Sequence, residues 1–386
     1  MRKLFYENIK LTEFTATVIS CDYDEAKKLY RILLDATALF PEEGGQPADK
    51  GTLDGQPVLD VQIKNDLIYH YVSNELSAGS TVTGQVDWTQ RFDFMQQHSG
   101  EHILSGLVHA RFGYDNVGFH LSNKEVTMDF NGELTEQDLR DIELRANEII
   151  YQNLPVEITY PSKEELALLS YRSKMDIDGQ VRIVTIPGVD VCACCAPHVE
   201  TTGAIGIIKI TNCQSHRGGV RLNILCGARA LADYNKKQDS VTAVSVALSA
   251  KQDRIADAVL KLKEDILYQK ERTNALQAGY LSLCVSALPS SSEAEDAVLF
   301  VDKMDTIAIR NTVNELVKRY PGYSAVFSGD GENGYQFIAG SSQKNCNELA
   351  GILRKELGAK CGGNTPMIQG SVTACKEQIE ACLKQA

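Results

Sequence analysis

Two pairs of strong metal-binding side chains stand out in this sequence. His98 and His102 lie four residues apart in the segment QHSGEHIL, and Cys194 and His198 have the same spacing far downstream. Residues i and i+4 of a helix point to the same side, so His98 and His102 are placed to bind one ion together. Three imidazoles and one thiolate suit zinc better than magnesium or calcium. The sequence therefore predicts one Zn2+ per chain.

Spacing alone leaves the choice of cysteine open. Cys192 and Cys195 flank Cys194, and together they have the Cys-x-x-Cys spacing of other zinc sites. Glu101 lies between the two histidines, about 60° around the helix from one and about 100° from the other. We therefore expect its side chain to flank the ligand face rather than to share it.

The composition is that of an ordinary globular protein. The chain has 386 residues, of which 43% are hydrophobic and 23% charged. No apolar stretch approaches membrane-spanning length, and the N-terminus meets charge too soon for a signal peptide, so we expect a cytoplasmic protein without a membrane partner. The 11 scattered cysteines favour reduced thiols over a disulfide framework. The net charge of −12 argues against a general nucleic-acid binder but not against local RNA contacts.

The order of the predicted elements indicates an α+β protein in four parts. Short segments rich in β-branched residues predict a small N-terminal β-barrel over residues 1–86. Residues 87–227 mix helices and strands and form the zinc-binding core. Residues 228–283 are dominated by a stretch without glycine or proline to residue 278, which predicts a long helical linker. Residues 284–386 follow as a separate α/β domain.

Individual elements follow from local signals. We expect a helix that runs through His98 to about Phe112 and another from an N-cap at Thr135 to about Tyr151. The predicted strands include residues 29–34, 58–63, 67–72, 81–86, 126–130, 181–186, 204–211 and 220–225.

The two histidine motifs resemble the zinc motifs of the alanyl-tRNA synthetase editing domain and of the freestanding AlaX proteins. The matching segments are residues 98–102 and 194–199. Residues 37–51, 118–120 and 218–222 also resemble segments of this family. The C-terminal part resembles the DHH-associated domain of alanyl-tRNA synthetases, with Gly362, Gly363, Gln369 and Gly370 in its glycine-rich signature. The resemblance covers nearly the whole chain and is to the long form of AlaX.

The resemblance also assigns roles to single residues. It selects Cys194 as the zinc ligand and implies Ser99 and His120 as catalytic pocket residues. Glycines at 44 and 45 would let the backbone approach the aminoacyl group, and Gln46 would bind substrate beside them. Separately, a positive cluster with Arg217 and Arg221 is placed to contact terminal tRNA phosphates. Each role has a structural alternative. Ser99 could be a helix-surface serine and His120 a structural histidine. The two glycines could simply form a turn, and the arginines could lie in a solvated loop.

The implied activity is trans-editing. The protein would hydrolyse serine, and also glycine, from mischarged tRNA(Ala) without charging tRNA itself, because no aminoacylation domain precedes the barrel. Zinc with four protein ligands has no open position. Either one ligand, such as Cys194, is displaced, or the metal mainly positions the substrate, and we favour the positioning role. The helical linker and C-terminal domain are candidates for homodimer formation. Two alternatives remain: editing of another mischarged tRNA, as in the threonyl system, and a non-enzymatic, zinc-stabilised RNA-binding module.

Overall fold

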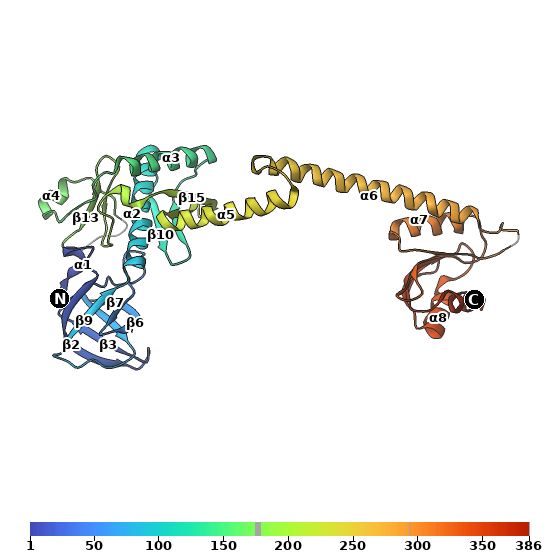
Figure 1. Ribbon diagram of the computed structural model, residues 1–386, viewed down its shortest axis with the longest axis horizontal. Helices are drawn as coiled ribbons and strands as arrows, with labels where there is room; N and C mark the ends of the chain where they lie inside the picture. Colours follow the sequence, from blue (N-terminus) through green and yellow to red (C-terminus); the bar gives the residue numbers. More distant parts are fainter. Residues whose placement is uncertain (174–178, 293, 386) are drawn as a thin grey trace. The chain divides into compact units, whose positions relative to one another are not determined.

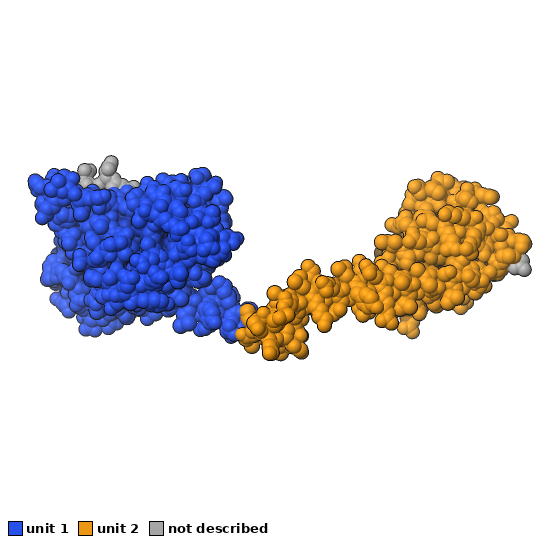
Figure 2. Space-filling view, turned by 90° about the horizontal axis from the view of Figure 1, so that it is seen from above, with its two compact units in different colours: residues 1–240 blue, residues 241–386 orange. Residues whose placement is uncertain are grey.

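The chain forms two compact units, residues 1–240 and 241–386, in a computed structural model (Figures 1 and 2). The structure describes residues 1–173, 179–292 and 294–385. Among these residues, no helix combines the length and the apolar character needed to cross a membrane.

The first unit begins with a seven-stranded antiparallel sheet that curves into a nearly closed barrel (Figure 1). Its strand order is β6-β5-β9-β2-β3-β8-β7. Alternate side chains of its strands point inward and bury a single apolar core, as in the regular alternation along β9. The strands are β2 (Glu13–Asp24), β3 (Leu29–Leu34), β5 (Gly51–Leu53), β6 (Gln56–Val58), β7 (Asp60–Lys64), β8 (Leu67–Val72) and β9 (Thr81–Val86).

A buried ion pair joins the barrel to the helix that follows it. Arg91 is fully buried on α2 (Trp88–Phe112), and its Nε lies 3.0 and 2.9 Å from the two carboxylate oxygens of Asp49. Its Nη2 donates to the carbonyl of Ala38 at 2.6 Å. Asp49 in turn accepts from the backbone N–H of Phe40 at 2.6 Å. The glycine-rich segment between β4 (Ala36–Thr37) and β5 is therefore fixed at both ends against α2.

Helix α2 is the centre of the rest of the first unit. A four-stranded sheet of order β10-β11-β16-β15 packs against it, together with a three-stranded sheet β12-β13-β14. A Cβ atom at Gly106 would lie 2.3 Å from the carbonyl oxygen of Val189, so only glycine allows α2 to approach β14 this closely. The elements are β10 (Asn116–Leu121), β11 (Val126–Phe130), α3 (Glu136–Gln152), β12 (Glu157–Thr159), α4 (Lys163–Leu168), β13 (Ile183–Ile186), β14 (Asp190–Ala193), β15 (Ile208–His216) and β16 (Gly219–Cys226).

The second unit contains a five-stranded sheet with helices. Its strand order is β17-β18-β19-β21-β20, and only the β17–β18 pair is parallel. Its elements are α6 (Ile255–Ser286), β17 (Ala297–Val301), α7 (Thr306–Val317), β18 (Ser324–Asp330), β19 (Gly334–Gly340), α8 (Cys346–Leu357), β20 (Lys360–Asn364), β21 (Met367–Val372) and α9 (Lys376–Leu383). Helix α5 (Gly227–Leu248) begins in the first unit, and the chain between α5 and α6 passes through a left-handed residue, Ser249, at φ 50°.

The α+β class and the barrel-like N-terminal sheet are confirmed, while several predicted boundaries were wrong. Helix α2 runs through His98 to Phe112 as predicted, and it begins at Trp88, with Asp87 as its N-cap. The predicted strand 58–63 is two strands, β6 and β7, separated at Leu59. The first part of the predicted strand 204–211 lies in a short 3-10 helix, Thr202–Ile205. The N-cap at Thr135 is confirmed and forms a capping box with Asp138.

Candidate metal centre

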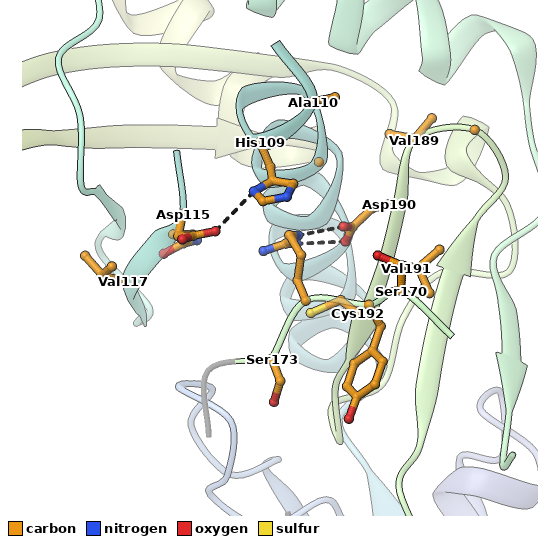
Figure 3. A pocket seen from close by; sticks show the side chains of 15 residues that line it. His109, Ala110, Asp115, Val117, Ser170, Ser173, Val189, Asp190, Val191 and Cys192 are labelled. Atoms are coloured by element: carbon orange, nitrogen blue, oxygen red, sulfur yellow. Dashed lines mark hydrogen bonds and ion pairs between the residues drawn. The ribbon is translucent and has the colours of Figure 1, made fainter. Parts of the chain in front are cut away.

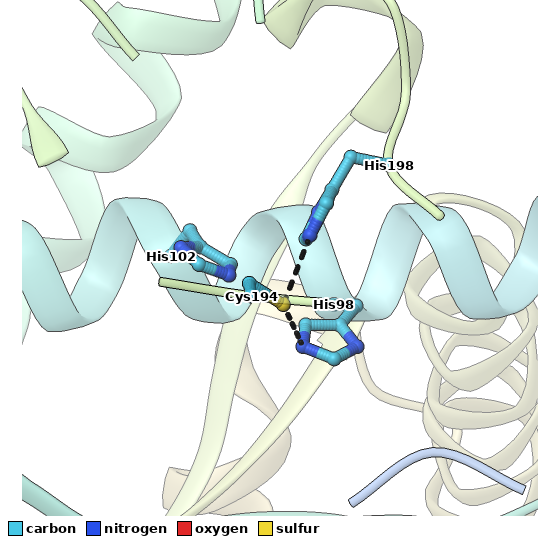
Figure 4. Close-up of side chains that lie close together, drawn as sticks. All are labelled: His98, His102, Cys194 and His198. Atoms are coloured by element: carbon cyan, nitrogen blue, oxygen red, sulfur yellow. Dashed lines mark hydrogen bonds between the residues drawn. The ribbon is translucent and has the colours of Figure 1, made fainter. Parts of the chain in front are cut away.

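Four side chains converge in the first unit. The donor atoms of His98, His102, Cys194 and His198 all lie within 4.8 Å of one another (Figure 4). The Sγ of Cys194 is 3.5 Å from Nε2 of His98 and 3.3 Å from Nε2 of His198. A nitrogen and a sulfur bound tetrahedrally to one zinc ion lie about 3.6 Å apart, given the usual bond lengths. The four residues therefore fit a zinc ion in both chemistry and spacing.

Two elements position these donors. His98 and His102 lie one turn apart on α2, and Cys194 and His198 lie in the loop that leaves β14. Arg182 holds this loop, because its Nη1 donates to the carbonyls of Cys194 at 2.7 Å and Ala196 at 3.0 Å. The backbone conformation of the loop is thus fixed by a charged side chain that the sequence analysis did not single out.

Each histidine is oriented by a second partner at its other nitrogen. Nδ1 of His98 lies 3.0 Å from Oε1 of Gln46, and Nδ1 of His102 lies 2.8 Å from Oδ2 of Asp190. Nδ1 of His198 lies 3.1 Å from Oγ of Ser99. Each partner can accept a hydrogen bond from the Nδ1–H group, which leaves Nε2 for a metal, and such outer partners commonly fix metal-binding histidines.

Charged groups around His102 favour a cation there. Burial lowers the pKa of His102, but the carboxylates of Glu101 and Asp190 outweigh it and raise the pKa well above its usual value. Arg172 holds Asp190 in place with hydrogen bonds of 2.7 and 2.8 Å. Burial raises the pKa of Asp190, but hydrogen bonds from His102 and Arg172 prevail and keep it low. The carboxylates therefore attract positive charge, which a bound metal supplies.

Cys194 is the cysteine whose position and ionisation suit a metal ligand. Burial raises the pKa of its thiol, but the charge of His98 outweighs this and holds the pKa well below its usual value, which favours the thiolate. Burial instead raises the pKa of Cys192 to about 11. Cys192 does form a second possible donor group with His102 and Asp190, but this group shares His102 with the first one. Cys195 packs elsewhere, against Gly44.

The glycine-rich segment lies beside the four donors. Gly44 and Gly45 have φ values of 64° and 78°, in the left-handed region that favours glycine. A Cβ atom at Gly44 would lie 2.9 Å from Sγ of Cys195, and one at Gly45 would lie 2.9 Å from the carbonyl oxygen of Phe119. Both a turn and a close approach therefore require these glycines. Next to them, Gln46 is 1% exposed, and its Nε2 has no hydrogen-bond partner among the residues that the structure describes.

The two predicted catalytic residues, Ser99 and His120, have opposite exposures: one is buried and the other is exposed. Ser99 is fully buried, and besides its contact with His198 its Oγ accepts from the N–H of Val199 at 3.2 Å. His120 is exposed on β10. Because side chains alternate along a strand, the neighbouring Phe119 takes the opposite face, and its ring centroid lies 4.8 Å from that of His98.

Arg217 and Arg221 lie in and next to the turn between β15 and β16. Arg221 is partly exposed and binds both oxygens of Asp129, at 2.6 and 2.7 Å, so part of its charge is already balanced. Arg217 is exposed in the turn at φ 46°.

A cavity of about 730 Å³ adjoins the outer partners of the metal centre (Figure 3). Asp190, which contacts His102, and Arg172 lie in its wall. Asn116, also in the wall, donates from Nδ2 to Oε1 of Glu101 at 2.6 Å. Glu101 is 2% exposed, and its Oε2 lies 3.7 Å from Nε2 of His102. The expectation that Glu101 flanks the ligand face was therefore incomplete, because its side chain reaches the metal-facing nitrogen.

Comparison with known proteins places these features in context. The family model for the threonyl and alanyl tRNA synthetase second additional domain matches residues 181–222, which include Cys194 and His198. The model for class II (A) tRNA synthetases matches residues 3–90, which include the barrel.

Similar proteins extend over more of the chain. The alanyl-tRNA editing protein Aarsd1 of Rattus norvegicus is 32% identical over 282 residues, which cover 69% of this chain and 68% of the rat protein. Aarsd1 of Danio rerio is 27% identical and covers 97% of this chain and 95% of its own length. The alanine–tRNA ligase of Ignicoccus hospitalis is 28% identical over 94% of this chain, but over only 40% of the ligase.

Proposed function

We propose a substrate preference from the premise that this chain is a member of the alanyl-tRNA editing protein family, as its similarity to these proteins shows. It hydrolyses seryl-tRNA(Ala) and glycyl-tRNA(Ala) and spares alanyl-tRNA(Ala). The protein is an aminoacyl-tRNA deacylase that acts in trans on mischarged tRNA(Ala). The observation that carries the proposal is the convergence of three histidines and one cysteine on a single point beside the glycine-rich segment.

The proposed metal is zinc, held by His98, His102, Cys194 and His198. The spacing of their donor atoms and the mixture of imidazole and thiolate support it. When bound, zinc supplies a positive charge that polarises the substrate and orients it. The contacts of Ser99 with His198 support a positioning role for Ser99 in place of contact with the substrate.

Gln46 is the residue we propose for recognition of the serine hydroxyl. Its Oε1 faces His98, while its buried Nε2 has no hydrogen-bond partner within the described part of the chain and could bind a ligand. A site that hydrogen-bonds a substrate hydroxyl discriminates strongly against an analogue that lacks it. Alanine lacks this hydroxyl. Gly44 and Gly45 would border the same pocket, where no side chain obstructs the aminoacyl group.

The remaining site residues would serve the tRNA. Arg217 is exposed, and Arg221 is partly exposed, so both are available to terminal phosphates. His120, also exposed, would lie at the outer side of this region. We further propose that the chain has four domains, with boundaries after residues 86, 227 and 283. The last of them, residues 284–386, would be a DHH-associated domain that contacts the tRNA body.

A homodimer is proposed through the helical linker and the C-terminal domain. Helix α6 carries exposed apolar side chains on its surface, including Leu260, Leu267, Leu276 and Leu283. Light scattering of the full chain should give twice the monomer mass, and a chain ending near residue 228 should be monomeric. A monomeric full-length protein would contradict this part of the proposal.

The deciding experiment is a deacylation assay on tRNA(Ala) charged with serine, glycine or alanine. The zinc-loaded protein should release serine and glycine well above the spontaneous rate and leave alanine attached. Ser-tRNA(Thr) serves as the comparison for the threonyl-type alternative. If all the esters decay only at the spontaneous rate while tRNA still binds, the protein is an RNA-binding module instead.

A further inference from the structure

Glu101 is a buried carboxylate that the metal centre as described so far does not use. It lies on α2 directly before His102 and is 2% exposed. Its Oε2 lies 3.7 Å from Nε2 of His102, the nitrogen opposite the one that contacts Asp190. His102 is thus bordered by a carboxylate at each of its two nitrogens.

Two neutral donors fix the orientation of Glu101. Its Oε1 accepts from Oγ of Ser105 at 2.9 Å and from Nδ2 of Asn116 at 2.6 Å, and these two donors are themselves 3.0 Å apart. Ser105 lies one turn further along α2, while Asn116 begins β10. Donors from two elements therefore hold Oε1, and this arrangement turns Oε2 toward the ligand nitrogen.

The position of Oε2 is that of a neighbour of the metal, not of a fifth ligand. Glu101 is absent from the group whose donor atoms all lie within 4.8 Å of one another, although it borders His102 from that group. A buried carboxylate at this position is placed to accept a hydrogen bond from a water molecule beside the four-residue group. The order His-x-x-Glu-His also occurs on the zinc-binding helix of a class of metal-dependent peptidases.

We propose that Glu101 is a catalytic residue that activates the water for ester hydrolysis. This inference rests on the proposed deacylase function. Oε2 accepts a proton from the water as the water oxygen bonds to the ester carbonyl carbon. The bond between that carbon and the ribose oxygen then breaks, and the proton passes from Glu101 to the ribose oxygen. The products are the free amino acid and the tRNA with its terminal hydroxyl, so no other reactant is needed.

The decisive variant is Glu101→Gln, which keeps the size of the side chain and removes its ability to take a proton. We expect kcat on seryl-tRNA(Ala) to fall about 10²- to 10⁴-fold, the usual contribution of general acid–base catalysis. KM, zinc content, zinc affinity measured against a chelator and thermal unfolding should stay near those of the unchanged protein. Glu148→Gln, at an exposed glutamate on α3, is the matched control and should leave kcat unchanged.

A second variant tests the same inference from outside the motif. Asn116→Ala removes one of the two donors to Oε1, so Oε2 is held less firmly and kcat should fall to a smaller extent with unchanged zinc content. Wild-type rates in both Glu101→Gln and Asn116→Ala would overturn the inference, as would loss of zinc from Glu101→Gln. A lack of hydrolysis by the unchanged zinc-loaded protein would instead overturn the proposed function.

Discussion

Gln46 and His98 connect the glycine-rich segment of the barrel to α2, the helix that carries the histidine pair, through a contact of 3.0 Å between Oε1 and Nδ1. The two residues are 52 positions apart in the sequence, and both side chains are buried. The orientation of a predicted metal ligand therefore depends on the barrel domain. A change in this segment should alter the metal centre as well as the substrate pocket.

Replacing Gln46 with alanine should reduce both metal binding and serine recognition. Loss of an outer partner commonly lowers metal affinity by about 10- to 100-fold. At saturating zinc, the rate on seryl-tRNA(Ala) should fall roughly tenfold more than the rate on glycyl-tRNA(Ala), because glycine has no hydroxyl to lose contact with. Deacylation assays on both substrates check this. Gln85→Ala, at an exposed position on β9, is the control, and equal losses on the two substrates would exclude the hydroxyl contact.

Cys194→Ser should remove most of the bound zinc, whereas Cys192→Ser and Cys195→Ser should retain it. Only the thiol of Cys194 faces Nε2 of two histidines. Elemental analysis of proteins purified without chelator should give about one zinc per unchanged chain. Equal losses in the three serine variants would show that another cysteine is the ligand.

Arg91→Leu should destabilise the first unit by about 3–5 kcal/mol, because it leaves the buried carboxylate of Asp49 without its charged partner. Urea unfolding can be followed by the fluorescence of Trp88, the single tryptophan of the chain, which lies three residues before Arg91 on α2. Arg140→Ala breaks an exposed ion pair on α3 and should change the free energy of unfolding by less than about 1 kcal/mol. Similar effects of the two changes would contradict the importance of the buried pair.

The stability of the barrel should fall in mild acid because of His70. Burial lowers the pKa of this histidine from 6.5 to about 4, and its Nε2 lies 2.8 Å from Oγ1 of Thr37. In the unfolded chain His70 takes up a proton as the pH falls below about 6.5, whereas the folded chain resists protonation until about pH 4. The free energy of unfolding is therefore unaffected by protonation of His70 above pH 6.5. It falls by roughly 3 kcal/mol as the pH is lowered from 6.5 to 4.

Comparison with His70→Gln isolates this effect from other titrating groups. The variant keeps a polar side chain that does not titrate in this range. The difference in free energy of unfolding between the two proteins, measured by urea titration at pH 7 and pH 4.5, should change by most of that amount. A constant difference would show that His70 does not titrate differently in the folded chain.

Local signals predicted much of the fold. The bounds of β3, β8, β9 and β11 agree with the predicted strands, since β-branched and aromatic residues alternate there between turn signals. The start of α2 was not predicted, because several buried positions in its N-terminal half carry polar side chains. Arg91, Gln96 and Gln97 interrupt the apolar stripe by which a helix is recognised. The start of α2 could have been predicted from Asp87, a residue type favoured at helix N-caps, which accepts a hydrogen bond from the N–H of Gln90.

The convergence of the two pairs could be anticipated from the sequence because each pair has a local spacing, whereas their supporting residues could not. Asp190 reaches His102 across 88 positions of sequence, and Phe119 reaches His98 from a neighbouring strand. Glu101 lies outside the donor group, as predicted, but helical angles describe only where its Cα–Cβ bond points and did not predict that Asn116 holds its long side chain near His102. Contacts made only in the folded chain have no counterpart in local spacing.

The wide separation of the two ligand pairs imposes an order on biosynthesis. His98 and Cys194 are 96 residues apart, so a nascent chain that has emerged only through the barrel and α2 carries two of the four donors. Proteins emerge N-terminus first, so the full set of four donors exists only after His198 has left the ribosome. If the proposed zinc binds there, it would be taken up late, after the barrel has had the chance to fold and while the second half of the unit is still being made.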